Sequence, residues 1–203
     1  MTKAVWGAGI RLAGAVSLVI ASVSCGDLVR QGTASSYLVM AELLAASGAD
    51  PSAFSGTLAS DVVTVKDGAA GIFGDFGRAT LRLGLKDPGS TGTPNTPTAN
   101  NSITIDRYRV EYRRTDGRNN QGVDVPYAFD SAITATVVSE TDVNFLIVRH
   151  QAKEEAPLRA LGSNNLIFST IATVTFYGHD QTGRAVSVSG NIGIGFANYG
   201  DPQ

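Results

Sequence analysis

Apolar and polar residues alternate in several separate runs of the chain that follows residue 50. The period is two residues, which is typical of strands with one buried face. The alternating runs are separated by segments rich in Gly, Pro, Asn and Asp, which favour turns. The pattern predicts strands over 54–65, 78–86, 103–114, 132–138, 143–149, 166–177 and 185–196.

The run 103–114 contains a change of phase. Tyr108 and the apolar residues after it occupy even positions, whereas Ile103 and Ile105 occupy odd positions. A regular strand would therefore point the two isoleucines away from the core. All the apolar residues of this run face the core only if the strand has a bulge near Asp106.

Residues 37–46 (YLVMAELLAA) leave two interpretations open. Their Leu, Met, Ala and Glu content favours a short helix, whereas their alternation fits a strand. Because the segments that follow have the pattern of strands, we predict that residues 37–46 form a first strand. About eight strands separated by turns predict a mainly β fold, an antiparallel immunoglobulin-like β-sandwich.

The sequence also predicts the form of three connections between strands. Residues 180–183 (DQTG) fit a type I turn closed by a glycine in the left-handed region, which would make the last two strands a hairpin. Residues 87–101 contain three prolines and predict a long loop. Residues 152–165 contain Pro157 and predict at most a short helix or a crossing loop.

The N-terminus has the pattern of a secretory signal. Lys3 and Arg11 precede the apolar run 12–23, and no acidic residue precedes Asp27. A positive start, a short apolar run and small residues after it are typical of signal peptides. The run from residue 12 is shorter than the roughly 20 residues that a spanning helix needs.

The only cysteine, Cys25, follows this run directly. The tripeptide Val23-Ser24-Cys25 resembles the cleavage motif of bacterial lipoproteins, although Ser22 stands where that family usually has an aliphatic residue. The resemblance implies that Cys25 carries lipid and anchors the protein to a membrane. Gly26 stands where an Asp commonly retains such proteins in the inner membrane, which favours the outer membrane. The expected organisation is a signal peptide over 1–24, a lipidated N-terminus and tether over 25–36, and one β-sandwich domain over 37–203.

Two further resemblances concern the mature chain. Residues 108–113 (YRVEYR), followed by Asp116 and Gly117, resemble the third strand of fibronectin type III-like domains. The chain also resembles an uncharacterised type of bacterial lipoprotein with terminal phrases such as VTFYGHDQTGRAVSVSGNIGIGFANYGDP. No activity is established for that type, so the resemblance implies fold and location only.

The charge balance and the single cysteine limit the classes of function and the kind of fold that we expect. Without residues 1–24, 14 Lys and Arg remain against 18 Asp and Glu, a balance of −4. Proteins that bind nucleic acid normally present a basic face, so we expect no nucleic-acid partner. A chain with one cysteine forms no internal disulfide, and the core alone must hold the fold.

Few residues suggest catalysis or a cofactor. Cys25 is assigned to lipid, and no Gly-x-Ser-x-Gly elbow occurs. His150 and His179 are the only histidines, and we expect both at the surface, at a strand end and beside a turn. We expect no cofactor.

Calcium is the metal hypothesis that the sequence leaves open, because calcium takes six to eight oxygen ligands. Two sets of aspartates flank polar loops: Asp116, Asp124 and Asp130, and Asp61, Asp67 and Asp75. Neither set has the spacing of an EF-hand loop. Aspartate is also a common turn residue, so capping of turns is the plainer interpretation of both sets.

Two surface features complete the candidates. Gly193 and Gly195 clear one face of the last strand, which predicts close approach of an aromatic ring or another backbone, or else a docking surface. Arginines on two strands would form one basic sheet face for acidic glycans, headgroups or proteins, unless they are simply solvated. These are Arg107, Arg109 and Arg113, with Arg78 and Arg82.

We therefore expect a non-enzymatic, lipid-anchored binding or structural accessory module of the cell envelope, facing the periplasm or the cell surface. Its partner would be an unknown envelope protein or glycan. Two alternatives stay open: an envelope hydrolase that uses loop carboxylates, and a subunit of a surface assembly joined through a strand edge. Aspartates clustered around a deep pocket would favour the hydrolase, and a long uncovered edge strand would favour assembly.

Overall fold

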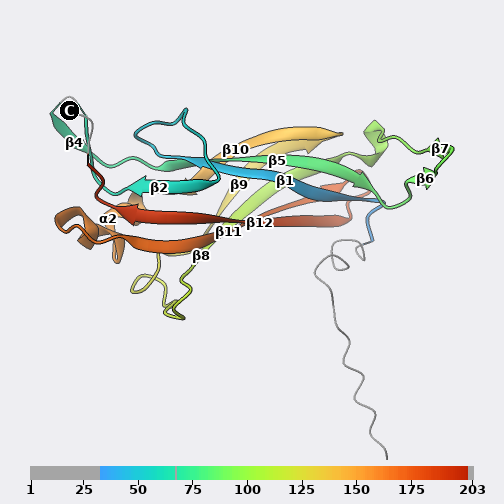
Figure 1. Cartoon of the computed structure of the whole chain (residues 1–203). Coiled ribbons are helices and arrows are strands. Elements are labelled where there is room, and N and C mark those ends of the chain that lie inside the picture. The colour runs from blue at the N-terminus through green and yellow to red at the C-terminus, as the bar shows by residue number, and fades with distance from the viewer. Residues whose placement is uncertain (1–32, 67, 201–203) are drawn as a thin grey trace, which may run out of the picture.

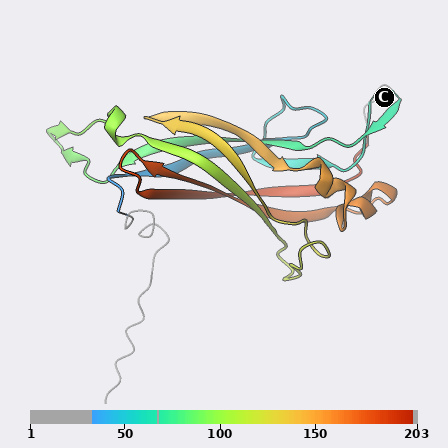
Figure 2. The same cartoon turned by 180° about the vertical axis from the view of Figure 1, so that it is seen from behind.

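Two β-sheets lie one above the other in the computed structural model, which describes residues 33–66 and 68–200 (Figures 1 and 2). The three-stranded sheet has the order β1 (Ser36–Ala46), β5 (Asp75–Leu85), β10 (Glu140–Val148). The five-stranded sheet has the order β2 (Thr57–Asp61), β12 (Ala185–Ala197), β11 (Phe168–Asp180), β8 (Ile103–Arg113), β9 (Phe129–Val137). The predicted mainly β, sandwich-like fold is confirmed.

The remaining elements are short and lie outside the two main sheets. They are the hairpins β3 (Thr64–Lys66) with β4 (Ala69–Gly71) and β6 (Gly89–Ser90) with β7 (Thr93–Pro94), the 3-10 turns η1 (Ala99–Asn101) and η2 (Leu158–Ser163), and the helix α2 (His150–Glu154). The β6–β7 hairpin lies at one end of the sandwich and α2 at the other (Figure 1). None of the helices described is long and apolar enough to cross a membrane.

Residues 37–46 form a strand, so the helical interpretation of this segment is wrong. The segment pairs with β5 from end to end, with Leu38 opposite Leu83 and one irregularity between Met40 and Glu42. Leu38 and Ala45 are both almost fully buried in the core. Contact with a long neighbouring strand thus overrides the intrinsic preference of Leu, Ala and Met for helix.

The predicted bulge in β8 is present at Asp106. Two consecutive residues of β11 pair with Ile105 and Arg107, which leaves Asp106 between them as the extra residue of β8. Ile105 on one side of the bulge and Tyr108 on the other are both buried. The bulge therefore turns the whole apolar set of this strand toward the core, as the change of phase in the sequence requires.

One strand of the five-stranded sheet, β2, differs from the others because it is parallel to its neighbour. β2 pairs parallel to β12, with Thr57 opposite Gly193, whereas every other described strand pair is antiparallel. The prediction of a single strand over 54–65 is wrong, because the chain turns after Asp61. The carboxylate of Asp61 accepts a hydrogen bond of 2.8 Å from the hydroxyl of Thr64, which closes that turn.

Aromatic rings fill the middle of the sandwich. The ring of Phe145, from the three-stranded sheet, lies 5.2 Å from the rings of both Tyr108 and Phe176 of the other sheet. The hydroxyl of Tyr112 donates a 2.6 Å hydrogen bond to the carbonyl of Ile147, which satisfies its buried polar group. Burial raises the pKa of Tyr112 well above its ordinary value. These contacts bind the two sheets to each other.

The hairpin of β11 and β12 has the predicted turn. The backbone N–H of Gly183 donates to the carbonyl of Asp180, and Gly183 has a φ of 82°. The Asp180 carboxylate accepts hydrogen bonds from the hydroxyl and backbone N–H of Thr182, and the former lowers the pKa of Asp180 most. The turn fixes the register that aligns the outward side chains of the two strands.

Candidate functional site

The outer face of the five-stranded sheet, on the side away from the three-stranded sheet, carries side chains in register across four strands. Ala132 of β9 lies opposite Arg107 of β8, which lies opposite Tyr177 of β11, which lies opposite Ser187 of β12. We call these four residues the Arg107 row. Because side chains in a strand alternate between faces, this row stands on the outside of the sheet.

In the next two rows along the sheet, hydrogen bonds join short polar side chains of β11 to those of β12. The hydroxyls of Thr175 and Ser189 lie 2.8 Å apart, and the hydroxyl of Thr173 donates to the side-chain oxygen of Asn191 at 2.7 Å. Both pairs join β11 to β12. Short side chains that are already bonded lose little further freedom when a ligand binds, so this surface is preorganised.

Two arginines of β8, Arg107 and Arg109, are held by acids of the same face. Asp130 accepts hydrogen bonds from Arg107 at 2.6 Å and from Arg109 at 2.5 Å, and Arg109 also pairs with Glu111 at 3.1 Å. Partial burial acts to raise the pKa of Asp130, but the bonds from Arg109 and Arg107 together outweigh it and lower that pKa. The charges of Arg107 and Arg109 are therefore compensated by neighbouring carboxylates.

The bulge in β8 shapes the part of the face that lies near the β11–β12 turn. It leaves two consecutive residues, Asp106 and Arg107, both exposed. The carboxylate of Asp106 lies 3.3 Å from Nδ1 of His179, and the guanidinium of Arg107 lies 4.0 Å from the centre of the Tyr177 ring. Two shallow hollows share Asp106 and Arg107. One extends over Tyr177 and Ser187, and the other over Asp130, Ser131 and Ala132.

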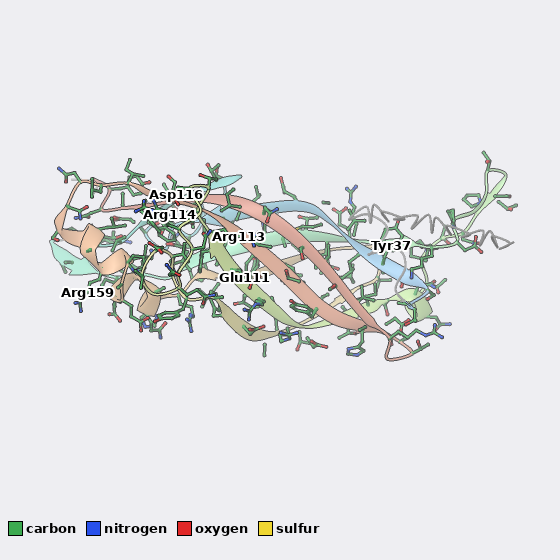
Figure 3. The ribbon with its side chains drawn as sticks, turned by 90° about the horizontal axis from the view of Figure 1, so that it is seen from below. Tyr37, Glu111, Arg113, Arg114, Asp116 and Arg159 are labelled. Carbon is green, nitrogen blue, oxygen red and sulfur yellow. The ribbon has the colours of Figure 1, made fainter. Side chains whose placement is uncertain are left out.

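The loop 114–128 joins β8 to β9 and hangs from the same sheet, away from the sandwich (Figures 1 and 2). Asp116 accepts hydrogen bonds from Arg114 at 2.6 Å and from Arg118 at 2.9 Å. These bonds, that of Arg114 first, hold the pKa of Asp116 far below its ordinary value. Figure 3 shows Arg114 and Asp116 beside Glu111 and Arg113, which are the last two exposed residues of β8.

The second half of the loop is also tied down. The side chain of Asn120 donates a 2.8 Å hydrogen bond to Asp124, and the carbonyl of Asn120 accepts the backbone N–H of Asp124 at 2.7 Å. Two large side chains remain uncovered, Val123 at 69% and Tyr127 at 50% exposure. A fixed loop with an exposed aromatic residue is a common form of recognition element.

The structure gives each aspartate of the first predicted calcium set a local partner. Asp116 binds arginines of the loop, Asp124 binds Asn120, and Asp130 binds arginines of β8. Across residues 33–66 and 68–200, no group of three or more His, Cys, Asp or Glu side chains is placed to share a metal ion. The visible role of these carboxylates is to fix the loop and the sheet face.

The second set of aspartates separates. Asp75 is fully buried, where it accepts hydrogen bonds from Lys153 and Ser60, and burial raises its pKa. Asp61 closes the turn after β2. Asp67 lies outside the described residues, as does Cys25, the predicted lipid site. Neither set therefore brings its described members around one cleft.

The single basic face expected from the arginines is not formed. Arg78 and Arg82 belong to β5, in the other sheet, where Arg82 pairs with Glu140 and Arg78 lies 4.4 Å from the centre of the Phe54 ring. Alternation within a strand cannot show which sheet the strand joins. The arginines of β8 and β5 thus serve two different surfaces.

The structure also tests the predictions made for the glycines of the last strand and for the two histidines. The hydroxyl of Tyr199 approaches Gly195 and donates to its carbonyl at 3.2 Å, so the predicted approach of an aromatic residue is confirmed there. His150 and His179 are exposed, as predicted. The sequence interpretation missed the hollows around Asp106, although the predicted bulge was the signal that could have located them. No protein-family model, curated protein or solved structure matches the chain.

Proposed function

We propose that the protein is a non-enzymatic binding module of the cell envelope. Lipid on Cys25 would hold it at a membrane, the outer one where the cell has two. The outer face of the five-stranded sheet, with the loop 114–128, would contact an envelope protein or glycan. The location rests on the signal-like N-terminus and the Val23-Ser24-Cys25 motif alone.

The fixed, charge-compensated part of the face around Asp130 is the observation that carries this proposal. Asp130 holds two arginines in place, and the hydrogen-bonded rows beside it fix the short polar side chains. A surface that is ordered before binding loses less conformational entropy on contact with a partner. The accessory role is favoured over the hydrolase because Asp116, Asp124 and Asp130 are bound to separate donors rather than facing one cleft.

Site-specific photo-cross-linking tests this proposal. A photoreactive amino acid replaces Thr134, an exposed residue of β9 that alternation places on the same face as Ala132. The matched control replaces Asn144, an exposed residue on the outer face of the three-stranded sheet. After irradiation of whole cells that make the protein, adducts are separated by electrophoresis and identified by mass spectrometry.

A defined adduct from position 134 and none from position 144 is the expected result. Adducts of equal amount from both positions would show non-specific contact and would overturn the proposal. Absence of any adduct from position 134, whether with a protein or with a glycan, would do the same, since a functional binding face must meet its partner in the cell.

Assembly through a strand edge is a second candidate, and β1 favours it. Among the described strands, β5 is the only hydrogen-bonded neighbour of β1 in its sheet. The other edge carries one isolated bridge, between Ala45 and Ser55. A long apolar edge strand is a template for pairing with another chain. Light scattering on the purified protein across a range of concentrations distinguishes assembly from a constant monomer mass.

A further inference from the structure

The two hollows on either side of Arg107 form a continuous shallow site across the sheet. Their volumes are about 300 and 370 Å³, and both are lined by Asp106 and Arg107. They extend along the Arg107 row from Ala132 on β9 to Ser187 on β12. Four adjacent strands give three spacings of about 4.8 Å, so the site is roughly 14 Å long.

The charge of this site disfavours an anionic ligand. Arg107 and Arg109 share Asp130, and Arg109 also binds Glu111. Asp106 adds a further carboxylate beside them, which faces His179. With each guanidinium already matched by a carboxylate, the row offers no surplus positive charge to attract phosphate, sulfate or uronic acid groups.

The same groups offer many fixed donors and acceptors to a neutral polar ligand. Arg107 donates, Asp106 accepts, and the hydroxyls of Tyr177 and Ser187 do both. The ring of Tyr177 and the methyl group of Ala132 supply apolar area within the same row. A sugar ring matches this mixture, because its hydroxyls donate and accept while its C–H groups pack on an aromatic side chain.

We propose that the Arg107 row binds a neutral oligosaccharide that lies across the strands. This inference rests on the proposed binding function and names its ligand class. Asp106 and Arg107 would bind hydroxyl groups of the central sugar unit. The side of the Tyr177 ring that Arg107 does not cover would support the apolar face of a neighbouring unit. The ligand therefore runs perpendicular to β8 and β11, in the direction of the two hollows.

A glycan array that carries neutral and anionic oligosaccharides tests the inference. The full chain is produced in bacterial cells and purified in a detergent without a sugar headgroup, which would otherwise compete. Binding to at least one neutral oligosaccharide is expected, and its affinity is then measured by isothermal titration calorimetry. Tyr177→Ala and Asp106→Asn should each weaken binding about tenfold, since each removes one central contact.

Arg82→Gln is the matched control, because it breaks an exposed arginine–carboxylate pair on the opposite sheet. It should leave the affinity unchanged. Binding of anionic glycans alone, no binding of any neutral glycan, or equal affinity in Tyr177→Ala and the parent protein would each overturn the inference. A protein adduct from position 134 combined with no glycan binding would refute the sugar ligand while leaving the binding module standing.

Discussion

The ammonium group of Lys153 lies 2.8 Å from a carboxylate oxygen of Asp75, and both side chains are sealed from solvent. Lys153 also donates to the carbonyl of Asp61 at 2.7 Å, and Ser60 donates to the second oxygen of Asp75 at 2.5 Å. Such a pair is costly to desolvate and is tolerated only when its hydrogen bonds are satisfied. The pair attaches α2 to the beginning of β5.

Breaking this pair should destabilise the fold strongly. Asp75→Asn or Lys153→Met alone leaves one buried polar group without its partner, and each should lower the free energy of unfolding by about 3–5 kcal/mol. The double variant should cost about 0.5–3 kcal/mol less than the sum of the two single variants. Urea unfolding followed by circular dichroism measures all four proteins. Additive losses would show that the two side chains are not energetically coupled.

Two glycines of the five-stranded sheet should respond differently to alanine. A Cβ at Gly178 would lie 2.1 Å from the backbone oxygen of Thr104, whereas a Cβ at Gly193 would meet only a methyl group of Thr57 at 3.9 Å. Gly178→Ala should therefore cost about 1–3 kcal/mol of stability. Gly193→Ala should stay within about 0.5 kcal/mol of the parent protein. Thermal unfolding of the two variants side by side decides this, and equal midpoints would contradict the packing described at Gly178.

The loop 114–128 should loosen in acid. Arg114, and then Arg118, lower the pKa of Asp116 in the folded loop relative to its ordinary value. A carboxylate with a depressed folded pKa contributes stability that is complete above the ordinary pKa of about 4, and that is lost as the pH falls through the folded value. Carboxyl ¹³C NMR should show a low midpoint for Asp116 that rises in Arg114→Gln.

Hydrogen exchange of the loop amides gives an independent readout of the same contact. Exchange corrected for its intrinsic pH dependence should accelerate in the parent protein as the pH falls below about 4. In Asp116→Asn, which carries no titrating group at that position, this acceleration should be absent. A loop that opens in acid to the same degree in both proteins would be controlled by some other group.

Cys25 should be required for attachment to lipid. Metabolic labelling with a fatty-acid analogue should tag the parent protein, because the Val23-Ser24-Cys25 motif resembles a lipoprotein cleavage site. Cys25→Ala should carry no label and should leave the membrane fraction, since no acyl chain would hold it there. Equal labelling of both proteins, detected on a gel, would refute the lipid anchor.

The strands and the bulge were predictable because both depend on local alternation. A bulge is required wherever the apolar parity changes within one strand, and the change between Ile105 and Tyr108 located it at Asp106. The turn before Gly183 was predictable for the same reason, because its residues act only on their own backbone. In each case the determining residues are neighbours in the sequence.

The buried ion pair was not predictable in this way. Lys153 lies in a segment whose charge and proline predicted at most a short helix or a crossing loop. Its burial depends on Asp75, which is brought beside it by the packing of α2 against the sandwich. The parallel pairing of β2 with β12 was missed because no local pattern specifies which edge a short strand will join.

The candidate site also has some features that the sequence predicted and others that it did not. The alternation in β8 correctly placed Arg107 and Arg109 on an outward face. That Asp130 neutralises both arginines follows from the register of β8 with β9, which alternation does not specify. The sequence therefore predicted charged residues at the surface but overestimated their net positive charge.

The parallel pairing of β2 with β12 sets the order in which the molecule can be completed. β2 is the second and β12 the last of the described strands in chain order, so their ladder from Thr57 and Gly193 onward forms only after β12 has been synthesised. Contacts between distant parts of a chain make folding slow. Until β12 has been made, β2 therefore lacks its partner, and this edge of the five-stranded sheet is incomplete.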